Sequence, residues 1–455
     1  ERTGWNPRVP PSGPNPPPPT PSEPWILEIF TYREKTSEKR TFREEYDFDT
    51  SDGFLNSVRL LTHTGEVPRR QSSDLLVQYA KRSDGLLESE AWSGGDCKRN
   101  SLTACSPSPA ATPAYVFSHD YQFGVRNSTK VQANGHDLNL LALTIDEATG
   151  LVATSKDTGG VATSYDYDEM GRLTQSQTSG AAAHVFSYSV PTWSSPLDPL
   201  QVHRTVTLGD VLEDETWHFD DLGRSVRHEA LTPEGIRGEL KAYNGMGWPT
   251  FISERIALNA TTTSGPGTQF LNFDVFGRPG SIVAADGSEA ILTYRGISRI
   301  DRTRYVGAGT SQAPLGTERT TVEHYDALGQ LRQVTEPNNK STRYKYDAVG
   351  HLKQVHPVSS DQTSRFFTYD GRGFLKAEEH PENGRTEYLY DAAGNPARTL
   401  TPTGTLLTTY DEAGRPLELH VATGQNQTSL LKKYGYFGHL SGTWQGKLRE
   451  ALATN

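Results

Sequence analysis

The sequence predicts an all-β fold built from an array of repeated β-hairpins. The chain of 455 residues repeats one short motif: an aromatic residue, aspartate, two or three variable residues, glycine and often arginine. Successive copies lie about 21 residues apart, or about ten residues further where a loop is longer. A second aromatic or apolar residue usually precedes the motif by two positions, which places both side chains on one face of a strand. A fixed period of this kind indicates a repeat architecture.

Each part of the motif has a structural role in a hairpin. The aspartate can accept hydrogen bonds from the N–H groups of the turn, and the glycine can adopt a positive φ at no steric cost. A period near 21 residues accommodates two strands of about seven residues and two turns. The predicted structural residues of the motif are Tyr167, Asp168, Gly171, Arg172, Phe219, Asp220, Gly223, Arg224, Phe273, Asp274, Gly277, Arg278, Tyr325, Asp326, Gly329, Tyr346, Asp347, Gly350, Tyr369, Asp370, Gly373, Tyr390, Asp391, Gly394, Tyr410, Asp411, Gly414 and Arg415.

The copies are expected to stack in register, with tyrosine beside tyrosine and aspartate beside aspartate on successive hairpins. Cross-strand aromatic pairs contribute roughly 0.2–1 kcal/mol each, and a single hairpin is at best marginally stable. The stack would therefore be the folding unit. We predict a regular array over residues 145–455, preceded by degenerate copies over 25–144, of which Phe48–Leu55 and Tyr79–Leu86 keep part of the motif.

The motif and its period resemble the YD repeats of the RHS (rearrangement hotspot) family. That family includes bacterial polymorphic toxins, the B and C components of Tc insecticidal toxin complexes, wall-associated proteins and the teneurins of animals. The resemblance extends over roughly residues 48–436, and it implies an array that spirals into a large curved sheet or hollow shell. In the toxin members such a shell encloses a C-terminal effector, whereas in teneurins a related shell serves adhesion. Fold alone does not decide between these activities.

The resemblance leads us to expect a non-enzymatic segment of a bacterial RHS shell, secreted or at the cell surface, which encapsulates and shields a C-terminal toxin or effector. The expected partners are that effector or the remaining repeats of the same polypeptide. Self-association through the terminal strands is also expected, because open strand edges pair with other chains. The alternatives are an adhesion module that binds glycan or protein, and an unrecognised carbohydrate-active enzyme with two carboxylates roughly 5–10 Å apart.

One feature of the toxin members is missing from this sequence. They usually carry an Asp-Pro-x-Gly signature after the repeats, linked to self-cleavage, whereas the Asp198-Pro199 pair is followed by Leu200. We therefore expect a piece of a longer protein, truncated at the C-terminal end of the array, without the self-cleavage machinery.

The N-terminal residues 1–24 differ from the rest in composition. Ten prolines fall between Pro7 and Pro24, a density that favours extended polyproline II structure. The segment is either a linker between domains or a plug that enters the mouth of the shell. The first strand is expected at Trp25–Phe30.

The repeat period is lost near residues 93–113, where we predict an inserted loop. Cys97 and Cys105, the only two cysteines of the chain, lie in this loop. In a secreted protein such a pair predicts a disulfide, with two free thiols as the alternative. Zinc is disfavoured because two cysteines without a nearby histidine pair do not complete a tetrahedral ligand set.

No catalytic, cofactor-binding or metal-binding residue is predicted. Asp157-Thr158-Gly159 matches the triplet of aspartic proteases, but it has no second copy and lies where a turn is expected. The 13 histidines form no His-x-x-x-His pair. The net charge of −10 disfavours nucleic-acid binding, and no apolar stretch approaches the 18 residues of a membrane-spanning helix.

Overall fold

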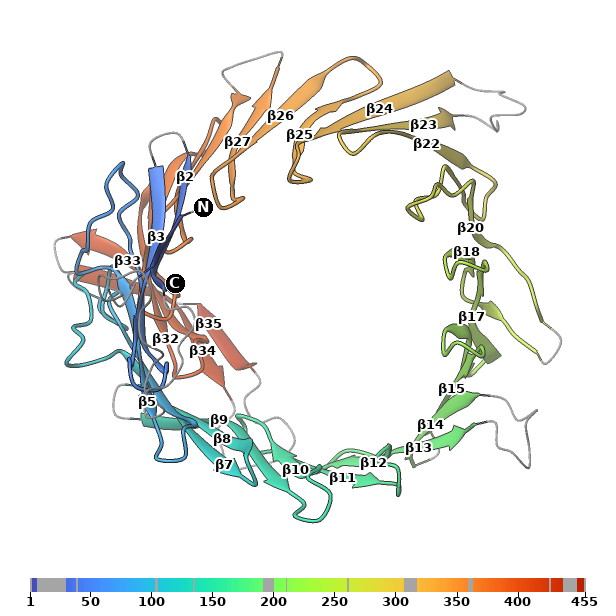
Figure 1. Ribbon diagram of the computed structural model, residues 1–455, viewed down its shortest axis with the longest axis horizontal. Coiled ribbons are helices and arrows are strands. Elements are labelled where there is room, and N and C mark those ends of the chain that lie inside the picture. Colours follow the sequence, from blue (N-terminus) through green and yellow to red (C-terminus); the bar gives the residue numbers. More distant parts are fainter. Residues whose placement is uncertain are drawn as a thin grey trace, which may run out of the picture. The chain divides into compact units, whose positions relative to one another are not determined.

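The fold consists of β-strands throughout the described residues. The computed structural model describes residues 2–5, 30–37, 40–102, 105–133, 136–190, 200–209, 211–259, 262–306, 317–358, 363–424, 427–436 and 448–453. Within these ranges the strands β1 to β35 form one large antiparallel sheet (Figure 1). The predicted all-β class is therefore confirmed. Over the same residues the structure contains no helix with the length and apolar character needed to cross a membrane.

The chain divides into two compact units. Unit 1 comprises Glu1–Val161, Lys345–His356 and Ser360–Asn455, and unit 2 comprises Ala162–Tyr344 and Pro357–Ser359. The predicted divisions after residues 24 and 144 concern the regularity of the repeats, and they stay predictions.

Unit 1 combines strands from both ends of the sequence. Figure 1 shows its N-terminal strands in blue beside its C-terminal strands in orange and red. Its strands are β1 (Arg2–Trp5), β2 (Phe30–Ser37), β3 (Arg40–Phe48), β4 (Leu55–Leu60), β5 (Leu75–Lys81), β6 (Leu87–Ser93), β7 (Tyr115–Gln122), β8 (Val125–Ala133), β9 (His136–Ile145), β10 (Val152–Lys156), β28 (Arg365–Tyr369), β29 (Leu375–His380), β30 (Gly384–Tyr390), β31 (Pro396–Thr401), β32 (Gly404–Tyr410), β33 (Pro416–Gly424), β34 (Gln427–Tyr436) and β35 (Leu448–Ala453).

Unit 2 is a single run of hairpins from the middle of the sequence. Its strands are β11 (Ala162–Tyr167), β12 (Leu173–Thr178), β13 (His184–Ser189), β14 (Gln201–Leu208), β15 (Val211–Phe219), β16 (Ser225–Thr232), β17 (Gly235–Tyr243), β18 (Pro249–Ser253), β19 (Ile256–Ala257), β20 (Gly267–Leu271), β21 (Ser281–Val283), β22 (Glu289–Arg295), β23 (Arg299–Val306), β24 (Thr317–Tyr325) and β25 (Leu331–Thr335). Two further strands, β26 (Ser341–Tyr346) and β27 (Leu352–Pro357), contain the boundaries between the units.

The N-terminus contains a strand that the sequence analysis did not predict. Arg2–Trp5 forms β1, which pairs antiparallel with β2. The proline-rich stretch, on which the linker or plug prediction depends, lies outside the described residues. Of the strand predicted at Trp25–Phe30, only Phe30 is described, and it begins β2.

The aspartate of each motif organises the turn between two strands. At Asp168, carboxylate oxygen Oδ1 accepts the backbone N–H groups of Met170 and Arg172, both at 2.9 Å, and Oδ2 accepts the Arg172 Nε–H at 2.7 Å. Gly171 has a φ of 77°, and the glycine of every predicted copy lies between 75° and 98°. The Arg172 N–H and side chain lower the pKa of the Asp168 carboxyl. The two backbone bonds to Oδ1 recur at Asp220, Asp274, Asp326, Asp347, Asp370, Asp391 and Asp411.

The aromatic residue of the motif, here called the anchor, usually ends its strand. Tyr167, for example, is the last residue of β11, and the register shifts by one residue between Asp166 and Tyr167. Tyr188 and Tyr294 each precede the last residue of their strands, and Phe273 lies beyond its strand, because β20 ends at Leu271 and Asn272 has a φ of 55°. That left-handed residue interrupts the strand between the predicted same-face pair Leu271 and Phe273.

Successive copies are joined by the guanidinium of an arginine stacked on the ring of the next tyrosine. We had expected the tyrosine rings of successive copies to contact each other. The guanidinium of Arg172 lies 4.6 Å from the ring centre of Tyr188, the next anchor, whose hydroxyl donates to the Leu173 carbonyl at 2.8 Å. Equivalent anchors are two strands apart, about 10 Å, so a long side chain must bridge them. The same joint connects Arg224 to Tyr243, Arg278 to Tyr294 and Arg415 to Tyr436, and a flat side chain replaces arginine where Trp248 meets Phe273, His351 meets Tyr369 and Phe374 meets Tyr390.

Candidate functional site

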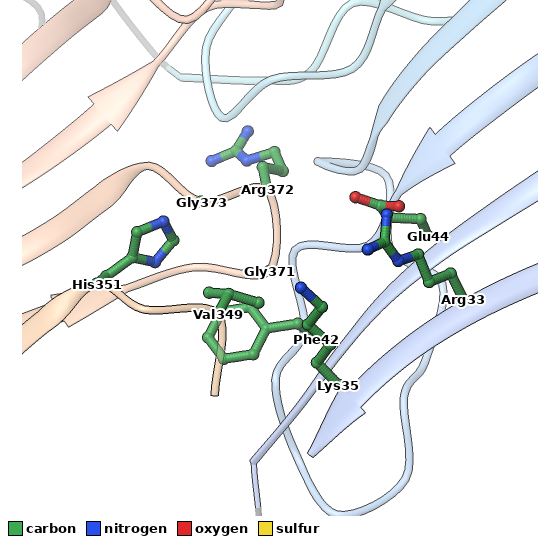
Figure 2. A pocket seen from close by; sticks show the side chains of 9 residues that line it. All are labelled: Arg33, Lys35, Phe42, Glu44, Val349, His351, Gly371, Arg372 and Gly373. Atoms are coloured by element: carbon green, nitrogen blue, oxygen red, sulfur yellow. The ribbon is translucent and has the colours of Figure 1, made fainter. Parts of the chain in front are cut away.

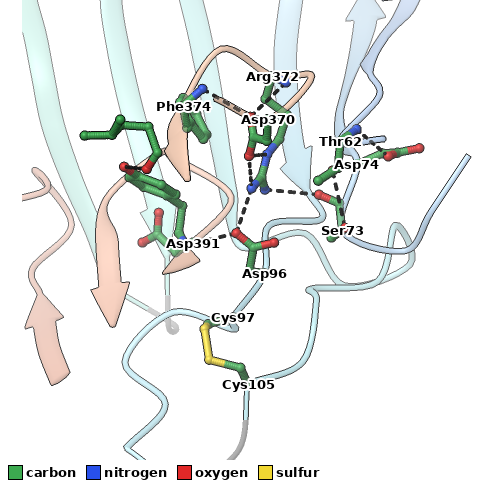
Figure 3. Close-up of polar contacts among 12 residues, drawn as sticks. Thr62, Ser73, Asp74, Asp96, Cys97, Cys105, Asp370, Arg372, Phe374 and Asp391 are labelled. Carbon is green, nitrogen blue, oxygen red and sulfur yellow. Dashed lines mark hydrogen bonds and ion pairs between the residues drawn. A yellow bond between two sulfur atoms is a disulfide. The ribbon is translucent and has the colours of Figure 1, made fainter. Parts of the chain in front are cut away.

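The most extensively buried polar region of unit 1 lies where loops of the N-terminal strands cover turns of the C-terminal repeats. One loop, residues 61–74, connects β4 to β5, and the other, residues 94–114, connects β6 to β7. They cover the motif turns of Asp370 and Asp391 (Figure 3), and the second loop also bonds the Tyr410 backbone beside the Asp411 turn. We call these two loops and three turns the clasp.

The first loop approaches the Asp370 turn along its backbone. Gly371 donates its N–H to the Thr62 carbonyl at 3.0 Å. A Cβ atom on Gly371 would lie 1.7 Å from the Leu61 carbonyl oxygen, so only glycine fits at this contact. The loop is shaped by Asp74, whose carboxylate accepts the N–H of Thr62 at 2.8 Å and that of Gln71 at 2.9 Å.

Arg372 is the centre of the polar network in Figure 3. Its guanidinium contacts the carboxylate of Asp370, bonds Asp96 Oδ2 at 2.6 Å, and donates to the Ser73 carbonyl at 3.1 Å. The side chains of Arg372 and Asp370 are 1% and 3% exposed. Burial raises the pKa of Asp370 in spite of the guanidinium beside it, and the two carboxylates raise the pKa of Arg372 against the effect of burial. One arginine therefore balances carboxylates from the two halves of the sequence.

The second loop pairs with the anchors of the next two turns as a strand edge would. Asp96 donates its N–H to the Tyr390 carbonyl at 2.7 Å and accepts the Tyr390 N–H on its carboxylate at 3.1 Å. Four residues later, the side-chain amide of Asn100 makes an equivalent pair of bonds with Tyr410. It donates to the Tyr410 carbonyl at 2.9 Å and accepts the Tyr410 N–H at 2.7 Å. Arg99 adds a bond to the Tyr410 carbonyl at 3.1 Å. The backbone groups of both anchors are thus satisfied from the other half of the sequence, those of Tyr410 by side chains alone and those of Tyr390 by backbone N–H groups and the Asp96 carboxylate.

Tyr115 covers the turn of Asp391, the second of the three turns. The Tyr115 hydroxyl donates to Asp391 Oδ2 at 3.0 Å and accepts from the Asn395 amide at 3.1 Å. Tyr115 and Asp391 are only 2% and 1% exposed. Burial and the nearby Asp391 charge raise the pKa of Tyr115, so the hydroxyl keeps its proton and the buried carboxylate keeps its donor.

A disulfide joins Cys97 to Cys105 and closes the second loop beside these contacts (Figure 3). Cys97 is fully buried, and its N–H shares the Tyr390 carbonyl with that of Asp96, at 3.1 Å. The disulfide restricts the backbone at Arg99 and Asn100, because both residues lie between the two cysteines.

Loss of the disulfide is expected to loosen the second loop alone. Removing a bridge of this kind typically costs about 2–4 kcal/mol. We expect the Asp96 N–H to exchange with deuterium faster in the Cys97→Ser/Cys105→Ser variant, and equally in the wild type treated with a dithiol reductant. The Gly371 N–H, held by the first loop, is the internal control and should keep its protection. Unchanged exchange at Asp96 would contradict the role given to the bridge.

Alkaline pH is expected to weaken unit 1. Burial, with a smaller effect from neighbouring carboxylates, raises the pKa of Tyr390 and of Tyr410 from 10.0 to about 12. Below pH 10 both states are protonated and the stabilisation is complete; between pH 10 and 12 the unfolded chain loses these protons first, so stability falls as pH rises. Thermal melting between pH 9 and 12 should show this decline, and a Tyr390→Phe/Tyr410→Phe variant should show a shallower one. An identical slope in both proteins would contradict the assignment.

The predicted motif residues fall into two groups. The turns of Asp168, Asp220, Asp274 and Asp326 belong to unit 2, where these side chains are 19–31% exposed. The turns of Asp347, Asp370, Asp391 and Asp411 belong to unit 1, and the clasp includes the last three. The sequence analysis predicted the turns and the inserted loop but not their contact, nor the roles of Asp96, Arg99, Asn100 and Tyr115.

A cavity of about 250 Å³ lies beside the clasp (Figure 2). It is lined by Arg33, Lys35, Phe42, Glu44, Val349, His351, Gly371, Arg372 and Gly373. Glu44 is the only carboxylate among these residues, so the cavity lacks the pair that glycoside hydrolysis requires. Its histidine is held by Asp347, 3.0 Å from Nδ1 to Oδ2. Asp157 caps a turn by accepting the N–H groups of Gly159 and Val161, and the described residues contain no group of three or more potential metal ligands.

Comparisons with known proteins agree with the repeat and the fold. Residues 146–183 and 325–362 match the family described as RHS Repeat. No curated protein matches the sequence. Solved structures that resemble the chain include TcdB2-TccC3-TEV, with a TM-score of 0.60 at 13% identity, and TcdB2-TccC3 without its hypervariable C-terminal region, at 0.59 and 12%. The Photorhabdus luminescens Tc holotoxin pore gives a TM-score of 0.51 at 13% identity.

These structures are much longer than the chain. Each comparison covers 91% of this chain but only 31%, 31% and 30% of the respective solved chain. At such identities the likeness concerns the fold, while the two matched segments carry the sequence signature itself. Two segments of the chain therefore match the RHS repeat family, and the chain as a whole resembles the TcdB2-TccC3 structures in fold.

Proposed function

We propose that the chain is a non-enzymatic wall segment of an RHS shell that encloses and shields an effector polypeptide. The clasp is the observation that carries this proposal. Its hydrogen bonds join residues 276 to 311 positions apart in the sequence. A linear array has no need for such contacts, whereas a wall that retains a passenger must connect its distant repeats.

The proposal assigns separate roles to the two kinds of contact. The arginine-on-tyrosine joints connect each repeat to the next, and the clasp connects repeats that are far apart. The fold likeness over 91% of the chain supports a wall built from such repeats. By analogy with the toxin members, the partner would be an effector or further repeats of the same polypeptide.

We also propose that the protein acts outside the bacterial cytoplasm, in a secreted or surface-attached form. The Cys97–Cys105 disulfide supports this location, because structural disulfides persist in oxidising compartments and are rare in the cytosol.

Protease protection of a passenger tests the proposal. A passenger domain fused after residue 455 would be exposed to protease in the wild-type chain and in an Arg372→Met variant with a weakened clasp. We expect slow cleavage in the wild type and rapid cleavage in the variant, with the passenger fused to an unrelated repeat protein as the control. Equal and rapid cleavage in both chains would overturn the proposal.

A further inference from the structure

The motif turns of unit 2 carry large apolar side chains at their tips. The second residue after the aspartate, or after Asn244 in one copy, is Met170, Leu222, Met246, Phe276 or Leu328. These side chains are 77%, 75%, 73%, 77% and 82% exposed. Isolated exposed apolar residues are ordinary, but five at one position of a repeat form a pattern. We call them the turn-tip row.

The turn-tip row lies on a single edge of the unit 2 sheet. Each of its turns follows a strand that ends at or just before an anchor, and it leads into the next strand. Examples are the turns between β15 and β16 and between β24 and β25. In an antiparallel run, alternate turns fall on the same edge. Ile297, 77% exposed in the turn between β22 and β23, falls on this edge too. Neighbouring tips from Leu222 to Leu328 are about 10 Å apart, the width of two strands, whereas Met170 lies four strands from Leu222, about 20 Å away.

The same motif position in unit 1 is occupied differently. Its residues are Val349, Arg372, Ala393 and Ala413; the first three are buried or half-buried, and the small Ala413 is exposed. Around Arg372 and Ala393, loops of other repeat strands cover the turn. The repeats thus have a face that another repeat layer can cover, and in unit 2 this face combines the largest apolar side chains with the highest exposure.

The arginines next to the turn-tip row are already paired. Arg172, Arg224 and Arg278 each bond the aspartate of their own turn, at 2.6–2.7 Å. Arg332 pairs with Asp326 at 2.9 Å. An identical edge brought against this one would therefore meet apolar tips between neutralised pairs, and the exposed carboxylates of Glu169 and Asp221 lie only beside Met170 and Leu222, at one end of the row.

The area of the row, about 600 Å², reaches the lower end of the range for specific contacts. Six large apolar side chains at this exposure offer on the order of 100 Å² each, which approaches the roughly 800 Å² per partner of a specific interface. Tips about 10 Å apart also leave gaps into which the tips of an opposed, identical row can fit.

We propose that the turn-tip row is an interface between two copies of this chain, with the two rows interdigitated about a twofold axis. Such an interface is self-complementary, as twofold contacts between identical subunits must be. It differs from the terminal strand edges, which the sequence analysis expected to associate, and it does not depend on the proposed shell function.

Sedimentation equilibrium over a range of concentrations tests the proposal. We expect a monomer–dimer equilibrium in the wild type, and at least a hundredfold higher Kd in the Phe276→Asp/Leu328→Asp variant. The control is Ile236→Asp, which places the same charge at a 43%-exposed residue on the opposite edge, and it should dimerise as the wild type does. Circular dichroism checks that every variant is folded. A wild type that stays monomeric would overturn the proposal, as would an unchanged dimer in the double variant, which would locate the contact elsewhere.

Discussion

Replacing Arg372 with methionine is expected to open the clasp and to lower the stability of unit 1 by about 3–5 kcal/mol. Methionine preserves much of the side chain's volume but leaves Asp370, 3% exposed, and Asp96 without their cation. Removing one partner of a buried ion pair has a cost of that size because the remaining charge is buried and uncompensated. The bond to the Ser73 carbonyl is lost as well. Thermal melting, together with hydrogen exchange at the N–H of Cys97, should report the change.

The matched control for this experiment is Arg224→Met. Arg224 pairs with Asp220 in the same kind of turn, but there the two side chains are 28% and 23% exposed. Exposed pairs contribute about 0–1 kcal/mol, and the contact of Arg224 with the Tyr243 ring adds roughly 0.5–1 kcal/mol, so this variant should lose at most about 2 kcal/mol, less than Arg372→Met. A double-mutant cycle with Asp96→Asn isolates the contact between the two loops. Equal losses in Arg372→Met and Arg224→Met would show that the clasp adds nothing to the turn itself.

A single methyl group at position 371 is expected to displace the first loop. In Gly371→Ala the new Cβ would lie 1.7 Å from the Leu61 carbonyl oxygen, and backbone must move to make room for it. Overpacking of this kind typically costs about 1–3 kcal/mol, and the bond from the residue 371 N–H to the Thr62 carbonyl should be lost too. Hydrogen exchange at that N–H should accelerate, and the melting temperature should fall.

Gly245→Ala is the control for the methyl group. Gly245 follows Asn244, just as Gly371 follows Asp370, and a Cβ there would have no heavy atom within 4 Å. Substitutions away from packed features usually stay within about 0.5 kcal/mol, so this variant should melt near the wild type. If Gly371→Ala also melts there, the close approach of the first loop does not contribute to stability.

The parts of the fold that the sequence predicted are those encoded within a few residues. Aspartate, glycine and arginine at fixed spacing define each turn locally, so the turn at Asp168 can be read from the motif alone. The joint between copies was missed, because the motif does not show that Arg172 reaches Tyr188. A signal was present: arginine or another flat residue recurs at the fourth position after the aspartate, although a solvent-facing turn does not require one.

The clasp could not be predicted because its partners are almost 300 residues apart and no local rule connects them. Two irregularities of the sequence nevertheless coincide with it. The copy at Asp370 has its arginine two residues after the aspartate instead of four, which directs Arg372 into the covered side of the turn. The interruption of the period near residues 93–113, predicted only as an inserted loop, holds Asp96 and Asn100 at the spacing that fits two successive anchors.

The joint between copies has a consequence for how this protein can evolve. Seven of the joints described above place an arginine or flat side chain against the anchor ring of the following repeat. A duplicated or deleted repeat therefore leaves one matching joint at the new junction, without compensating substitutions on either side. The array can change in length by whole repeats while the clasp residues remain as they are, so the number of repeats and the contacts between its distant parts can be selected separately.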